Sequence, residues 1–167
     1  SMSGGLYVAP YQSQKECMCL QREFAQESIV PGTRAMDANF AFMAALRAIQ
    51  QGDYESASQN IRKYSEYSSP GKNVTRNEAC NFLLGLMYLN QGQYNKAISS
   101  YLKSDVTNIC VKYNLGVAYH LTGDLEQAER MFAEVSQTNS TSYSKSDMIR
   151  TANRWMKSMS IAMEQQK

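Results

Sequence analysis

The chain is poor in several residue types on which common enzyme and metal chemistry depends. It has one histidine and four cysteines, and the closest pair, Cys17 and Cys19, is separated by a single residue. That spacing is poor for a zinc site, and His120 has no second histidine to join it as a metal ligand. A phosphate-binding glycine loop and a nucleophile elbow are also missing from the sequence. We therefore expect no enzymatic activity, no metal site and no cofactor.

Long apolar runs and an excess of one charge are absent as well. No run approaches the roughly 18 apolar residues that a membrane-spanning helix needs, so membrane insertion is not expected. The net charge is only +2, and no basic stripe of the kind with which a helical repeat tracks RNA is visible. We expect a protein or peptide partner and no nucleic acid. The cysteines form no disulfide framework, which suits a reducing compartment and predicts a cytoplasmic location.

A short pattern occurs twice, over residues 84–101 and again 31 residues later over 115–132. Each copy reads Leu-Gly-x-x-Tyr, then a turn glycine, then alanine and, four residues on, an aromatic residue. A mid-helix glycine costs about 1 kcal/mol relative to alanine, which is tolerated where a second helix packs closely. We expect Ala97 and Ala128 to be the small residues opposite these glycines. The matched residues are Leu84, Gly85, Tyr88, Gly92, Ala97 and Tyr101, and Leu115, Gly116, Tyr119, Gly123, Ala128 and Phe132.

This pattern resembles the tetratricopeptide repeat, a helix pair with a nominal period of about 34 residues. The resemblance implies an all-α fold, a tetratricopeptide-type α-solenoid of antiparallel helix pairs wound into a right-handed superhelix. A degenerate third copy lies upstream, with Ala45 in place of the close-packing glycine and with Gly52 at the turn. We therefore expect three repeats within 35–136, at about 35–67, 76–104 and 108–136.

The segments on either side of the repeats have predictable roles. Residues 1–12 show no periodicity and predict a flexible arm, and residues 13–30 predict an N-terminal helix that ends at Pro31-Gly32. That helix would lie against the first repeat or partly over the groove. Residues 145–165 predict a capping helix, because a repeat stack needs its last face covered. The apolar stripe of the capping helix consists of Met148, Ala152, Trp155, Met159 and Met163.

The resemblance also implies which residues line the concave surface, since the first helix of each pair faces it. Counting from the close-packing position places a mostly apolar set there. Phe42, Leu46 and Phe82 stand where the branch that grips chaperone tails carries basic or asparagine residues, so such a clamp is not expected. The expected partner-binding residues are Phe42, Leu46, Ile49, Phe82, Leu86, Leu89, Asn90, Tyr113, Val117 and His120.

A contiguous apolar strip usually marks an interaction site. The main hypothesis is a non-enzymatic protein–protein interaction module, an adaptor or scaffold that binds an apolar peptide or amphipathic helix of a partner in its groove. Three other occupants are possible: the chain's own helix at Gln14–Ser28, a second protomer in a homodimer, or other domains of a larger protein. Two alternative functions stay open, a secretion-type chaperone that holds a client and a structural segment of a longer solenoid.

Overall fold

The computed structural model describes residues 34–67, 74–138 and 143–165. This part of the chain folds into seven α-helices and contains no strand. The flexible arm predicted for 1–12 and the helix predicted for 13–30 lie outside the described residues. The helices are α3 (Arg34–Gln51), α4 (Tyr54–Glu66), α5 (Val74–Asn90), α6 (Tyr94–Leu102), α7 (Ile109–Thr122), α8 (Leu125–Ser136) and α9 (Tyr143–Gln165).

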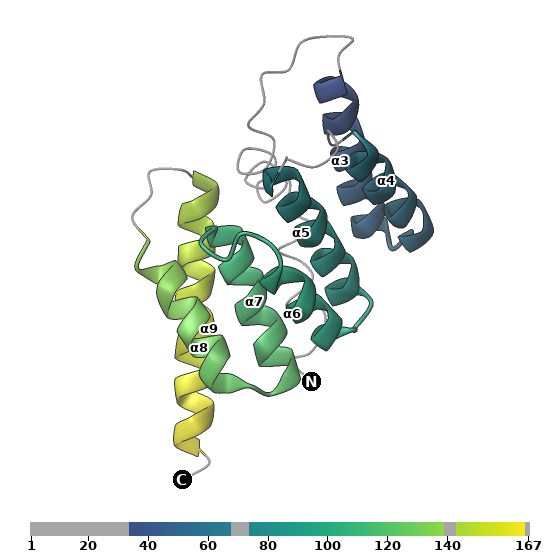
Figure 1. The fold of residues 1–167 in the computed structure, drawn as a ribbon. Coiled ribbons are helices and arrows are strands. Elements are labelled where there is room, and N and C mark those ends of the chain that lie inside the picture. Colours follow the sequence, from purple (N-terminus) through teal and green to yellow (C-terminus); the bar gives the residue numbers. More distant parts are fainter. Residues whose placement is uncertain (1–33, 68–73, 139–142, 166–167) are drawn as a thin grey trace.

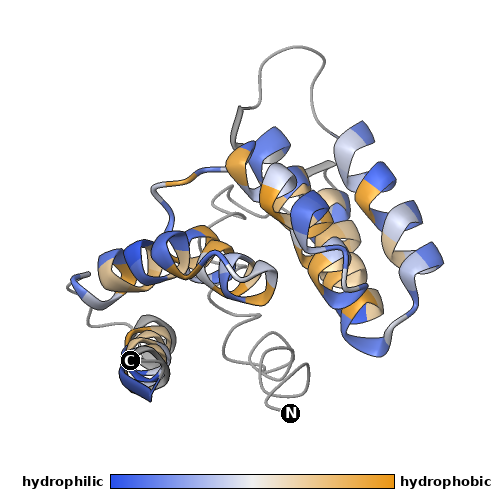
Figure 2. Cartoon of the chain, turned by 90° about the horizontal axis from the view of Figure 1, so that it is seen from below, coloured by the Kyte–Doolittle hydropathy of each residue, from blue (hydrophilic) through white to orange (hydrophobic). Residues whose placement is uncertain are grey.

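The helices pack as three consecutive antiparallel pairs, α3–α4, α5–α6 and α7–α8, and the predicted all-α solenoid is confirmed (Figure 1). Each second helix also contacts the first helix of the next pair, and the first helices α3, α5 and α7 contact one another in order. The stack therefore has a layer of first helices and a layer of second helices. Hydrophobic and hydrophilic positions alternate around the helices (Figure 2), as packing between neighbouring pairs requires.

The turn inside each pair uses the same glycine geometry. Gly52, Gly92 and Gly123 have φ angles of 74°, 75° and 85°, a left-handed conformation that only glycine adopts at little cost. Each glycine N–H donates to the carbonyl three residues earlier, and the next residue's N–H donates to the carbonyl five residues earlier. This is the Schellman ending of a helix, and it turns the chain directly into the second helix.

The residue after each of these glycines caps the second helix, but not equally well. Asp53 accepts a hydrogen bond from the Ser56 N–H at 3.1 Å, and Asp124 accepts one from the Gln127 N–H at 3.2 Å. Hydrogen bonds from the side chain and the backbone of Ser56 lower the pKa of Asp53. Gln93 occupies the same position before α6 and makes no side-chain capping bond. The middle turn therefore lacks a contact that the outer two have.

The mid-helix glycines make room for aromatic rings of the second helix. A Cβ atom on Gly85 would overlap the Tyr101 ring, and one on Gly116 would lie 2.7 Å from Cε1 of Phe132. The expectation that Ala97 and Ala128 would be the residues opposite the glycines is therefore corrected. Both alanines are fully buried, but the rings that follow one helical turn later reach over the glycines and fill that space.

The last helix, α9, takes the place that a fourth first helix would occupy. It packs on α8 and also contacts α7, just as α7 packs on α6 and contacts α5. Met148, Ala152 and Met159 of its predicted stripe are buried, and Trp155 is half-buried. The side chain of Met163 lies outside the described residues. Helix α9 thus covers the end of the stack that the third pair would otherwise expose.

Candidate partner-binding surface

The ten predicted partner-binding residues lie on the first helices of the three pairs, as their register requires. Eight of them are buried in the folded chain, with between 0% and 4% of each side chain exposed. Asn90 and His120, near the ends of α5 and α7, are half-buried. In this conformation a partner could therefore reach Asn90 and His120, but not the apolar members of the set. Those eight are Phe42, Leu46, Ile49, Phe82, Leu86, Leu89, Tyr113 and Val117.

The aromatic members of this set contact the second helix of their own pair. The ring centroids of Phe82 and Tyr101 are 5.7 Å apart, and those of Tyr113 and Phe132 are 5.9 Å apart. These distances are typical of stabilising aromatic pairs. The aromatic residue at this position therefore joins the two layers of the stack, whatever else it contacts. Register alone could not show this, because it places a residue on a helix without giving the direction of its ring.

The accessible members of the set are polar and lie at the carboxyl ends of their helices. Asn90 donates its side-chain N–H to the Leu86 carbonyl at 2.8 Å, so its amide is held along the helix axis. Gln50 of α3, which the same register points inward, is also half-buried. We call the layer of first helices α3, α5 and α7 the inner layer. Its central residues are apolar and buried, and the residues near the carboxyl ends of its helices are polar and accessible.

His120 belongs to an aromatic cluster that joins the third pair to α9. Its ring meets Trp155 edge-on with the ring centroids 4.6 Å apart. Trp155 in turn stacks on Phe132 at 5.4 Å with an angle of 12° between the planes. Burial lowers the pKa of His120. Trp155 was predicted only as part of the capping stripe. Its closeness to His120 depends on how α9 docks, which the sequence pattern does not specify.

A comparison with protein families identifies the kind of repeat in the second and third helix pairs. The tetratricopeptide repeat profile matches residues 79–105 and 111–140. Both matched stretches are tetratricopeptide repeats. The two matched stretches cover most of α5 with α6 and most of α7 with α8, which confirms the predicted family. Such repeats generally mediate protein–protein interaction and are typically non-enzymatic. No curated protein and no solved structure matches the chain significantly.

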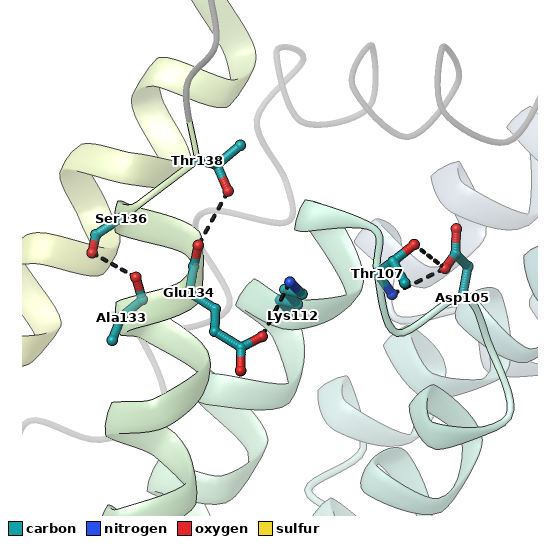
Figure 3. A network of polar contacts seen from close by, with 7 residues as sticks. All are labelled: Asp105, Thr107, Lys112, Ala133, Glu134, Ser136 and Thr138. Atoms are coloured by element: carbon teal, nitrogen blue, oxygen red, sulfur yellow. Dashed lines mark hydrogen bonds and ion pairs between the residues drawn. The ribbon is translucent and has the colours of Figure 1, made fainter.

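The connection between the second and third tetratricopeptide repeats is fixed by short polar contacts. The Asp105 carboxylate accepts hydrogen bonds from the N–H of Thr107 at 3.0 Å and from its hydroxyl at 2.6 Å (Figure 3). The Ser104 hydroxyl donates to the Glu78 carbonyl on α5 at 2.7 Å. Desolvation and the nearby Asp105 raise the pKa of Glu78. These contacts hold a tight connection in place and assemble no reactive group.

The third repeat has polar contacts of its own in α7 and α8 (Figure 3). The Lys112 ammonium of α7 lies 3.0 Å from the Glu134 carboxylate of α8. The hydroxyls of Ser136 and Thr138 donate to the carbonyls of Ala133 and Glu134 at the end of α8. A partly exposed ion pair of this kind contributes about 1 kcal/mol or less. Its role is to join the two helices of the repeat.

Sequence reasoning missed the apolar side chains that remain exposed. Phe40 on α3 is 60% exposed, and Leu102 and Val106 beside the α6–α7 connection are 54% and 43% exposed. A single exposed apolar residue is ordinary for a folded protein. Leu102 directly follows the buried Tyr101, so its outward position can be recovered from the helical period of α6. No pattern would have selected Phe40.

The described helices offer no arrangement for metal or membrane chemistry. Among residues 34–67, 74–138 and 143–165, no group of three or more His, Cys, Asp or Glu side chains could hold a metal ion. Within the same residues, no helix has the length and apolar character required to cross a bilayer.

Proposed function

We propose that this chain is a non-enzymatic adaptor or scaffold that binds an amphipathic helix or apolar peptide of a partner protein. The partner would lie on the inner layer formed by α3, α5 and α7. The observation that carries the proposal is that three successive first helices carry apolar residues at equivalent register positions. Such a row matches a ligand helix whose apolar residues recur every three to four positions.

The half-buried edge of the inner layer gives the partner a point of entry. Asn90 and His120 lie at this edge, on neighbouring first helices. In the proposed complex they hydrogen-bond polar groups of the partner and fix its position, while the buried apolar residues provide the contact area after the layer opens. A cytoplasmic location belongs to the same proposal and is supported by a cysteine pattern that suits a reducing compartment.

The proposal is tested by affinity capture with a matched pair of substitutions. Asn90→Arg places a bulky charge on the inner layer at a half-buried position. Asn95→Arg makes the same change five residues later, at an exposed position on α6. Substitution of Phe82 would be a poor test, because Phe82 is buried against Tyr101 and its loss would disturb the fold itself.

We expect a protein that is captured by the unmodified chain and by Asn95→Arg, but at least tenfold less by Asn90→Arg, a difference of about 1.4 kcal/mol. Mass spectrometry identifies the captured protein, and overlapping peptides from it locate the bound segment. That segment should carry apolar residues every three to four positions. Equal capture by both folded variants, or a bound segment without that spacing, would contradict the proposal.

A further inference from the structure

One side of α3 is exposed although the same side of α5 and α7 faces the preceding helix pair. We define this side by three register positions, five residues before, one before and two after the close-packing position of each first helix. On α5 the third position is Met87, whose sulfur accepts a hydrogen bond from the Ser58 hydroxyl of α4 at 3.4 Å. On α7 the three positions are 2% exposed or less, and they hold Val111, Leu115 and Ala118.

On α3 the same three positions hold Phe40, Ala44 and Arg47, which we call the outer side of α3. Phe40 is 60% exposed, Ala44 is half-buried and Arg47 is exposed. Helix α3 packs mainly on α4 and α5, and no other helix of the described part of the chain lies before it. The outer side therefore leaves a phenyl ring in water at a position that is buried in the third pair.

We propose that the outer side of α3 packs on the outer side of α3 in a second copy of the chain, with the two helices antiparallel. Such an interface uses the same surface on both copies. With the two-fold axis midway between Met43 and Ala44, Phe40 would lie level with the partner's Arg47, because each is three and a half residues from the axis. Ala44 would lie next to the axis, where a small side chain lets two helices approach closely.

The charges on this side select the antiparallel arrangement. An arginine over an aromatic ring is a favourable cation–π contact, and it would form twice, between each Phe40 and the partner's Arg47. Asp37 is exposed one helical turn before Phe40 and would lie about 4.5 Å along the axis from the level of the partner's Arg47, which is within reach of a long side chain. In a parallel pair, equal charges would oppose each other and repel.

The dimer should be weak and should leave the inner layer accessible. Contact along one helix buries less than the roughly 1,200 Å² at which stable interfaces begin, so we expect a Kd of about 1 μM or above. None of the three positions that define the outer side is among the inward-facing ones. A dimer would present two inner layers and would hold a partner with two binding segments more tightly. Only this last consequence rests on the proposed function.

Sedimentation velocity of the full chain, without any partner, tests the dimer between about 1 μM and about 1 mM. We expect a reversible dimer, and Phe40→Glu should raise its Kd at least tenfold. The matched control is Leu102→Glu, which places the same charge at an apolar residue of α6 that is 54% exposed, and it should leave the Kd unchanged. A monomer at every concentration, or equal weakening by the two variants, would overturn the proposal.

An exchange of charges tests the antiparallel arrangement. Arg47→Asp should weaken the dimer because it brings acidic residues of the two copies together, and Asp37→Arg should weaken it by bringing basic residues together. The double variant Asp37→Arg/Arg47→Asp restores opposite charges and should dimerise at least threefold more tightly than either single variant. A double variant that is no tighter than the single variants would contradict the antiparallel pair.

Photocrosslinking identifies the surface that Phe40 contacts. Benzoylphenylalanine replaces Phe40 in a mixture of unlabelled and isotope-labelled chains, so that products between chains are recognised by their mass. We expect these products on α3, close to Arg47, and at least fivefold less of them when the same group replaces Leu102. Between-chain products on another helix, or products only within one chain, including those with residues 13–30, would overturn the proposal. Because no partner is present, this outcome is independent of the comparison between Asn90→Arg and Asn95→Arg.

Discussion

The first helix pair and the two that follow fill the space at the crossing of their two helices with different residues. In α5–α6 and α7–α8, a glycine on the first helix makes room for an aromatic ring of the second helix. In α3–α4 the corresponding positions hold Ala45 and Ile61, both buried. A smaller residue on the second helix therefore accompanies a larger one on the first. The combined volume of the two side chains at this crossing is therefore maintained while the two residues vary.

The family match falls on the same two pairs. The matched residues, 79–105 and 111–140, cover the pairs with the glycine–aromatic combination and leave out α3–α4. Yet α3–α4 keeps the left-handed turn glycine Gly52 and the capping aspartate Asp53. An aromatic contact between the two helices also persists, with Phe42 and Tyr64 5.5 Å apart between ring centroids. The pair α3–α4 thus keeps the turn geometry and an aromatic contact with a different residue combination at its crossing.

Removal of the second-helix residue should distinguish the two kinds of crossing most strongly. Phe132→Ala should lower the free energy of unfolding by about 4 kcal/mol, and Ile61→Ala by about 2 kcal/mol. Phe132 contacts Gly116, Tyr113 and Trp155, so its loss leaves a larger cavity. Urea denaturation of the two variants measures the difference. An equal loss would mean that the crossings do not differ in the way described.

Addition of a methyl group at the glycine should reveal the coupling between the two positions. Gly85→Ala should destabilise the chain by about 1–2 kcal/mol, because overpacking against Tyr101 outweighs the better helix propensity of alanine. The double variant Gly85→Ala/Tyr101→Ile recreates the combination found in α3–α4. It should be more stable than the sum of the single effects by about 1 kcal/mol. A double-mutant cycle in urea provides the test, and additive single effects would show that the residues do not compensate.

The missing capping bond at the middle turn should have a smaller effect on stability, and a substitution can supply it. Gln93→Asp should supply the capping bond that Asp53 and Asp124 make, and should stabilise the chain by about 0.5–1 kcal/mol. The control is Asp124→Gln, which should destabilise by a similar amount. Thermal unfolding gives both values. A Gln93→Asp variant with an unchanged or lower melting temperature would mean that the middle turn cannot use the cap.

The smallest effect on stability should come from His120. It occupies the register position that holds the aliphatic residues Ile49 and Leu89 in the first two pairs. Burial lowers the pKa of His120 in the folded chain, so the unfolded chain binds more protons near the ordinary histidine pKa of about 6.5. The contribution of His120 should therefore be lost as the pH falls from above 7 to below 6. His120→Leu should remove this part of the pH dependence. Denaturation series at several pH values compare the two proteins, and parallel pH profiles would contradict the assignment.

Much of the fold could be predicted from the sequence, because the features that determine it are local. Gly92, Gly123 and the apolar period between them specify the helix pairs, and the stripe through Met148 and Ala152 specifies α9. The residues opposite the glycines could not be predicted correctly, since ring orientation depends on how two helices cross. The extent to which Phe82 and Leu86 are buried was also beyond a register argument, which identifies a face of a helix but not what lies over it.

We propose that the inner layer of α3, α5 and α7 binds the partner. Hydrogen exchange of the full chain, measured by mass spectrometry with and without the bound partner segment, tests it most directly. We predict slower exchange in peptides from α5 and α7 when the segment binds. The same segment at the same concentration should produce little such protection in Asn90→Arg. Protection confined to α4, α6 and α8 would place the partner on the opposite layer and contradict the account.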